Sequence, residues 1–176
     1  MRGVFMKKTL LFFIVIPFLL VSLAAHVVIG FDDADLQRLK STNQCPGCNL
    51  KGVVLTEAKL PNAKLAGAKI SSASISNSKL ANADFSGADM SYINLTSADL
   101  TGADMSNTNL RVAILINAKL EKVNLSKANL AGAALWDANL TGANLDGANL
   151  TGAFLAGAIW IDGKKCNEDS KGECKK

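Results

Sequence analysis

The sequence has very few of the side chains on which most enzymes depend. Histidine occurs once among the 176 residues, as His26, and this residue lies in an apolar N-terminal stretch that we expect to be removed. The many serine and threonine hydroxyls then have no histidine that could act as a base and activate them. The sequence therefore predicts a protein that is not an enzyme and that has no cofactor and no metal site.

Strong charge of one sign is also missing. The formal net charge is +4, and three of the positive charges, Arg2, Lys7 and Lys8, belong to the N-terminal stretch, which has no acidic residue. Without residues 1–30 the net charge falls by three, from +4 to +1. A surface so close to neutral gives no electrostatic reason to expect nucleic acid or an anionic membrane as a partner.

Residues 1–30 have the features of an export signal. Basic residues precede an apolar run from Thr9 to Ile29, which is the arrangement of a Sec-type signal peptide. Pro17 and the Ala24-Ala25 pair favour cleavage, whereas a run of roughly 20 residues is also long enough to stay as a membrane anchor. We expect an exported protein, periplasmic or extracellular, or in the thylakoid lumen of a photosynthetic source. The membrane is a partner only if this segment is retained.

The rest of the chain follows a period of five. From Leu50 to Leu155 every fifth residue is bulky and apolar, and the residue two positions earlier is usually small, as in Ala63 and Leu65. On an α-helix, steps of five rotate by about 140°, so these side chains would form no stripe. On a straight strand they would alternate between the two faces. The pattern fits a very short strand followed by a corner, and pairs such as Thr101-Gly102 suit a corner.

The composition of the repeats adds a family resemblance. Repeats such as Ala-Asn-Leu-Thr-Gly and Ala-Asn-Leu-Asp-Gly resemble those of the pentapeptide-repeat family, whose pattern is Ala-Asp/Asn-Leu-X-X. The resemblance spans about residues 48–161 and implies an all-β fold, a right-handed quadrilateral β-helix of stacked coils. We expect residues 45–161 to form this solenoid, residues 31–44 a short N-terminal capping helix, and residues 162–176 a C-terminal cap.

The four cysteines form two pairs, one near each end of the repeats. Cys45 and Cys48 fall in the repeat register, so both should point into the first coil, whereas Cys166 and Cys174 lie in the C-terminal cap. A thioredoxin-like redox site would need a strand–helix context that is missing here. A zinc site shared by all four would need the pairs to meet, but a rod roughly 25 Å long separates them. We expect two structural disulfides, Cys45–Cys48 and Cys166–Cys174, as is common in exported proteins.

One part of the expected surface breaks the rule that outward positions are polar. Residues twenty apart should stack on one side of the rod, and on one side the outward positions of the C-terminal coils hold Ile114, Ile116, Trp136 and Phe154. A patch of this kind is either covered by the C-terminal tail or binds a second copy or another protein. The sequence favours neither interpretation.

These observations predict a non-enzymatic exported scaffold or protein-binding module. The resemblance offers one alternative, since some family members imitate the shape and charge of duplex DNA and bind topoisomerases. Such mimicry needs an acidic face, whereas Lys59, Lys79 and Lys119 share one side of the rod with only Asp99. Export would also separate the protein from cytoplasmic DNA enzymes. A further alternative is a membrane-tethered structural protein, which needs residues 1–30 to be retained.

Overall fold

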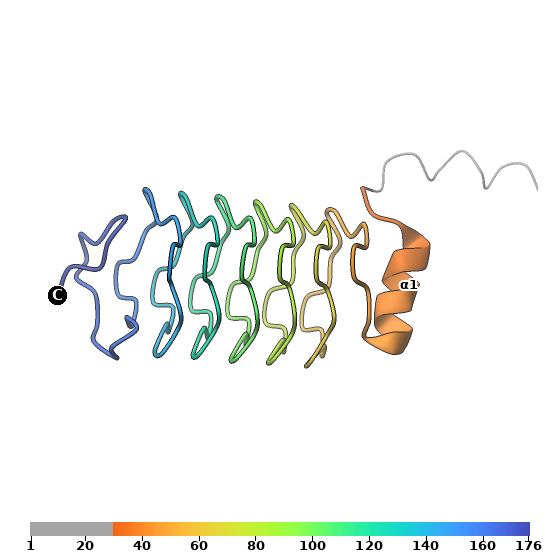
Figure 1. Cartoon of the computed structure of the whole chain (residues 1–176), viewed down its shortest axis with the longest axis horizontal. Coiled ribbons are helices and arrows are strands. Elements are labelled where there is room, and N and C mark those ends of the chain that lie inside the picture. The colour runs from red at the N-terminus through yellow and green to blue at the C-terminus, as the bar shows by residue number, and fades with distance from the viewer. Residues whose placement is uncertain (1–29) are drawn as a thin grey trace, which may run out of the picture.

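The computed structural model describes residues 30–176, so the expected signal or anchor lies outside the described residues except for Gly30. The described chain forms a rod of stacked coils with one α-helix at its N-terminal end (Figure 1). No helix within residues 30–176 is long and apolar enough to span a membrane.

Parallel backbone bridges between residues twenty apart stack the coils. They run from Gln44↔Lys64 to Asn139↔Ile159, so each coil contains four five-residue repeats. Among the described residues these bridges are all isolated, and none of them extends into a strand. The reason is that a corner follows every pair of inward residues. The central residue of a repeat donates its N–H to the next coil, as Leu100 does to the Lys119 carbonyl at 2.9 Å. The predicted β-helix is therefore confirmed.

The corners explain why aspartate or asparagine stands before many of the central residues. Its Oδ1 accepts the backbone N–H two residues later, as in Asp84 with Ser86 at 3.1 Å and Asn139 with Thr141 at 3.0 Å. The corner then closes through a residue with a positive φ angle, for example Gly147 at 68°. Glycine and asparagine tolerate this conformation best, so Val112 at 57° is a costly exception.

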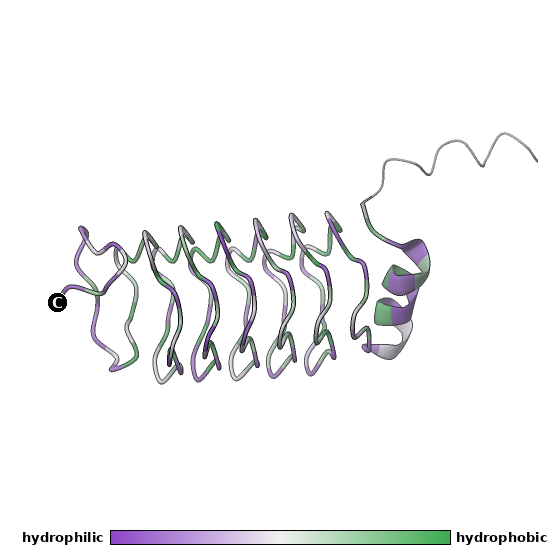
Figure 2. Ribbon diagram, turned by 45° about the horizontal axis from the view of Figure 1, so that its top comes forward, coloured by the Kyte–Doolittle hydropathy of each residue, from purple (hydrophilic) through white to green (hydrophobic). Residues whose placement is uncertain are grey.

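The interior of the rod is filled by side chains from every coil. Central residues such as Phe85 and Leu100 are 0% exposed, and so is the small partner Ala98. Two polar residues, Ser78 and Thr108, occupy the small position, and each donates its hydroxyl to a backbone carbonyl. Figure 2 shows the resulting alternation of hydrophobic and hydrophilic segments along each coil.

Helix α1 (Asp33–Thr42) covers the N-terminal end of the rod (Figure 1). Its N-cap, Asp32, accepts the backbone N–H groups of Ala34 and Asp35 through its side chain. Its buried residues, Leu36 and Leu39, pack on the core. The helix is shorter than the expected segment 31–44 because the residues at both ends leave the helical conformation to cap it.

The C-terminal tail, residues 162–176, adds half a coil to the rod. It runs antiparallel along the last coil, with bridges Ile159↔Lys165 and Phe154↔Lys171. The other half of that coil has no strand beyond it, so Leu145 and Leu150 are only half-buried. The last coil is therefore less completely packed than the coils in the middle of the rod.

Candidate functional site

The predicted apolar patch forms one face of the C-terminal coils. We call the outward group Val112, Ile114, Ile116, Trp136 and Phe154 the apolar face. Parallel bridges Ile114↔Ala134 and Ala134↔Phe154 stack its coils in register. Val112 and Trp136 are each 40% exposed, Ile114 is 38% exposed and Phe154 is 37% exposed, while Ile116 is half-buried. The structure therefore places the four predicted patch residues on stacked coils and leaves Val112 exposed at the corner two residues before Ile114.

The tail reaches one end of the apolar face. The rings of Trp136 and Phe154 are tilted against each other with centroids 5.4 Å apart. Lys171, from the tail, places its ammonium nitrogen 5.0 Å from the centre of the Phe154 ring. This contact covers part of Phe154, but Trp136 lies one coil away and Ile114 two coils away, and both keep their exposure.

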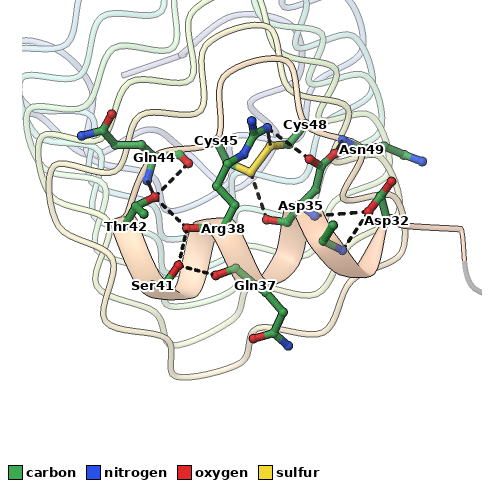
Figure 3. The surroundings of a disulfide bond; sticks show 11 residues. Asp32, Asp35, Gln37, Arg38, Ser41, Thr42, Gln44, Cys45, Cys48 and Asn49 are labelled. Atoms are coloured by element: carbon green, nitrogen blue, oxygen red, sulfur yellow. Dashed lines mark hydrogen bonds and ion pairs between the residues drawn. A yellow bond between two sulfur atoms is a disulfide. The ribbon is translucent and has the colours of Figure 1, made fainter.

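The N-terminal disulfide lies between the first coil and helix α1 (Figure 3). Cys45 and Cys48 are bonded, with Cα atoms 5.4 Å apart, and are 0% and 1% exposed. The Arg38 guanidinium lies 2.7 Å from the Cys48 sulfur and 3.1 Å from the Asp35 carboxylate. Asp35 also accepts the backbone N–H of Asn49 at 2.8 Å. The disulfide therefore has charged neighbours although both of its sulfurs are buried.

The repeat register correctly predicted that the two cysteines lie in the first coil, but it gave no prediction for Asp35 and Arg38. Their spacing of three on a predicted helix, with opposite charges, was the available signal. Asp35, Cys45 and Cys48 each offer one possible metal-ligand atom, and these atoms lie within 4.8 Å of one another. The disulfide occupies both sulfurs, and the Arg38 cation beside Cys48 opposes a bound metal ion.

The second disulfide, Cys166–Cys174, ties the tail to itself. Its Cα atoms are 5.2 Å apart, and Cys166 is buried. Cys174 packs against the core, and among the described residues the polar contact of its sulfur is with the backbone carbonyl of Lys175 at 3.9 Å. Among the described residues no charged side chain forms a hydrogen bond to either sulfur, so the two disulfides differ in their surroundings.

Charge is arranged in bands along the rod. Residues 45–83 contain five lysines and one acidic residue, and residues 84–104 contain four aspartates and no basic residue. Lys79, Asp99 and Lys119 follow one another in adjacent coils. Burial acts to raise the pKa of Asp99, but hydrogen bonds from Thr101 and the two nearby lysines outweigh it and leave the pKa below its ordinary value. No acidic surface runs along the rod on this side.

Comparison with known proteins gives a clear result for the repeats. The family model described as pentapeptide repeats matches in eight copies, over residues 48–87, 78–117, 88–126 and 124–159. No curated protein matches the sequence.

Several solved structures are similar to the rod. A trypsin-treated form of QnrB1, a plasmid-mediated fluoroquinolone resistance protein, is 24% identical with a TM-score of 0.62, covering 65% of this chain and 58% of that one. Full-length QnrB1 is 21% identical with a TM-score of 0.50, covering 61% and 62%. HetL, a pentapeptide repeat protein from Nostoc involved in heterocyst differentiation regulation, is 33% identical with a TM-score of 0.29, covering 69% and 63%. This chain thus spans less than two thirds of each of these proteins, and the likeness to QnrB1 concerns the fold.

Proposed function

Because this chain belongs to the pentapeptide-repeat family, whose model matches more than half of its length, we propose that it is a non-enzymatic scaffold whose apolar face binds another protein. The exposure of Ile114, Trp136 and Phe154 carries this proposal. Trp136 matters most, because aromatic side chains dominate the binding energy of protein interfaces.

Two residues of the apolar face lack a corner hydrogen bond that stabilises other repeats. Ile114 and Phe154 occupy the position where, in many other repeats, aspartate or asparagine accepts a backbone N–H, as Asn94 does from Thr96 at 3.0 Å. An isoleucine or phenylalanine cannot accept that hydrogen bond, so each corner gives up a local stabilising contact. Departures from a local rule of this kind are typical of functional surfaces.

The shape of the apolar face suits a flat or extended partner. Its members lie on three consecutive coils, which are stacked at about 4.8 Å, so the face is short and regular along the rod. Backbone bridges hold each coil, which limits the rearrangement needed for binding. A rigid surface loses little conformational entropy when a partner binds, and this favours affinity.

We also propose the finer features that the family resemblance implies. The coil is right-handed and quadrilateral, with one repeat on each side. The protein is exported to an oxidising compartment, which is supported by the pairing of all four cysteines in disulfides and by the signal-like composition of residues 1–30. The charge bands do not favour the alternative of a DNA mimic, because lysines interrupt the acidic positions along the rod.

The test replaces Trp136 with glutamate and compares it with Ser76→Glu, which changes the equivalent outward position three coils earlier. Both variants should keep the circular dichroism spectrum of the rod, because neither side chain is part of the interior. We expect Trp136→Glu to abolish partner capture, or to convert a self-associating protein into a monomer in sedimentation, whereas Ser76→Glu does neither. A photo-crosslinker at position 136 should label the partner in the native compartment. Unchanged mass, labelling and capture in Trp136→Glu would contradict the proposal.

A further inference from the structure

The two disulfides are held in chemically different environments, and the difference points to a second activity that is independent of the apolar face. The Cys48 sulfur has a permanent cation, Arg38, at 2.7 Å. The Cys166–Cys174 bond has no charged hydrogen-bond partner among the described residues. A cation beside one sulfur stabilises the thiolate form of that sulfur and lowers the pKa of the corresponding thiol.

We propose that Cys45–Cys48 is a thiol–disulfide exchange site for dithiol reductants, and that Arg38 stabilises its reduced form by pairing with the Cys48 thiolate. Arg38 lies on helix α1, and its side chain extends from the helix toward the disulfide (Figure 3). Its side chain is 51% exposed, although the two sulfurs beside it are buried. The site accepts electrons from a reductant, and it needs none of the strand–helix framework of a thioredoxin-like enzyme.

The exchange proceeds in two balanced steps. A thiolate of the dithiol attacks the Cys45 sulfur, the Cys45–Cys48 bond breaks, and Cys48 leaves as a thiolate. The second thiol of the reductant then loses its proton and attacks the reductant sulfur that is bonded to Cys45. This closes the disulfide of the reductant and releases Cys45. Cys45 takes up a proton, so two electrons pass to the protein and the dithiol becomes a disulfide. Arg38 lies beside Cys48 and can pair with the departing thiolate, which makes Cys48 the sulfur that leaves.

Asp35 destabilises the Cys48 thiolate that Arg38 stabilises. Its carboxylate lies within 4.8 Å of both sulfurs, and a negative charge there disfavours a thiolate. Arg38 contacts both the carboxylate and the Cys48 sulfur, so its charge is divided between them. The balance between these two residues sets how easily the disulfide is reduced.

Helix α1 controls access to the site. Both sulfurs are buried beneath it, so a reductant reaches them only when the helix moves. Two hydrogen bonds join the start of α1 to the first coil. The Asp32 N–H donates to the Asn49 carbonyl at 2.8 Å, and the Asn49 N–H donates to the Asp35 carboxylate. Reduction replaces the neutral disulfide on which this helix packs with a thiolate paired with Arg38.

The test is a redox titration of the full chain in buffers of reduced and oxidised dithiothreitol. Free thiols are alkylated, and peptide mapping reads both disulfides in the same sample. We expect Arg38→Met to lower the equilibrium constant for reduction of Cys45–Cys48 about tenfold, equal to about 30 mV. Asp35→Asn should raise this constant, because the amide keeps an acceptor for the Asn49 N–H but removes the charge.

Two controls separate this effect from a change in folding. Lys40→Met removes a charge from the same helix, and among the described residues no hydrogen bond or ion pair joins Lys40 to the disulfide, so the equilibrium constant should not change. Cys166–Cys174 should titrate identically in all variants. The reduced protein should also absorb at 240 nm through a thiolate at neutral pH, and Arg38→Met should lose this absorbance. The proposal is overturned if Arg38→Met and Lys40→Met behave alike, or if Cys45–Cys48 stays oxidised until circular dichroism reports loss of the rod.

Discussion

Replacing one leucine in the middle of the rod tests how tightly the stacked coils are packed. Leu100 is 0% exposed, and so are Leu80 and Leu120, the residues at the same position in the adjacent coils. Leu100→Ala removes three carbon groups, worth about 0.8 kcal/mol each in lost hydrophobic transfer. A cavity term adds to this because the surroundings cannot collapse, so the total cost should be about 3–5 kcal/mol.

The backbone ladder is the reason that the cavity remains open. The Leu80 N–H bonds the Asp99 carbonyl at 2.7 Å, and the Leu100 N–H bonds the Lys119 carbonyl at 2.9 Å. These bonds hold the coils on both sides of residue 100 at a fixed spacing. A loss of about 3–5 kcal/mol corresponds to a fall in melting temperature of about 6–20 °C for a chain of this size.

Leu150→Ala is the matched control. Leu150 has the same central role, but it is only half-buried in the last coil, so the same truncation should cost about 1–2 kcal/mol. Thermal melting and urea unfolding followed by circular dichroism measure both variants, with the urea m-value reporting whether unfolding stays cooperative. Equal destabilisation of Leu100→Ala and Leu150→Ala would refute the argument that stacked coils on both sides prevent relaxation.

Two further predictions concern the corners and the charge bands. Val112→Asn should raise the urea midpoint and add up to about 1 kcal/mol to the free energy of unfolding, because asparagine tolerates the positive φ that strains a β-branched residue. Gly147→Val should lower the free energy of unfolding by about 1–2 kcal/mol for the converse reason. The opposite order would contradict the positive φ at these corners. Asp99 has a folded-state pKa below the ordinary 3.8, so its contribution to stability is present above that pH and is lost as the pH falls through the folded-state pKa. Asp99→Asn should therefore lose less stability than the parent protein when urea unfolding is compared between pH 5 and pH 2, and identical pH profiles would show that Lys79 and Lys119 do not stabilise this carboxylate.

The five-residue period of the sequence was sufficient by itself to predict the architecture of this protein. A bulky residue at every fifth position can face a common interior only if the chain turns after each repeat, and this requirement excluded both a helix and a straight strand. The same register placed Leu100 and the cysteines at 45 and 48 inside, and Ile114, Trp136 and Phe154 outside. These positions could be read from sequence because each depends only on its place within a local repeat.

Contacts between the repeats and their caps were decided by the tertiary structure alone. The tail covers Phe154 through Lys171 but leaves Trp136 exposed, and the sequence could not predict how far it extends because residues 162–176 follow no repeat. Arg38 meets Cys48 only because α1 turns one particular face toward the first coil. The sequence shows which face of a short amphipathic helix is apolar, but its rotation and position on the rod depend on packing with residues far along the chain. The charged neighbours of the N-terminal disulfide therefore became visible only in the folded molecule.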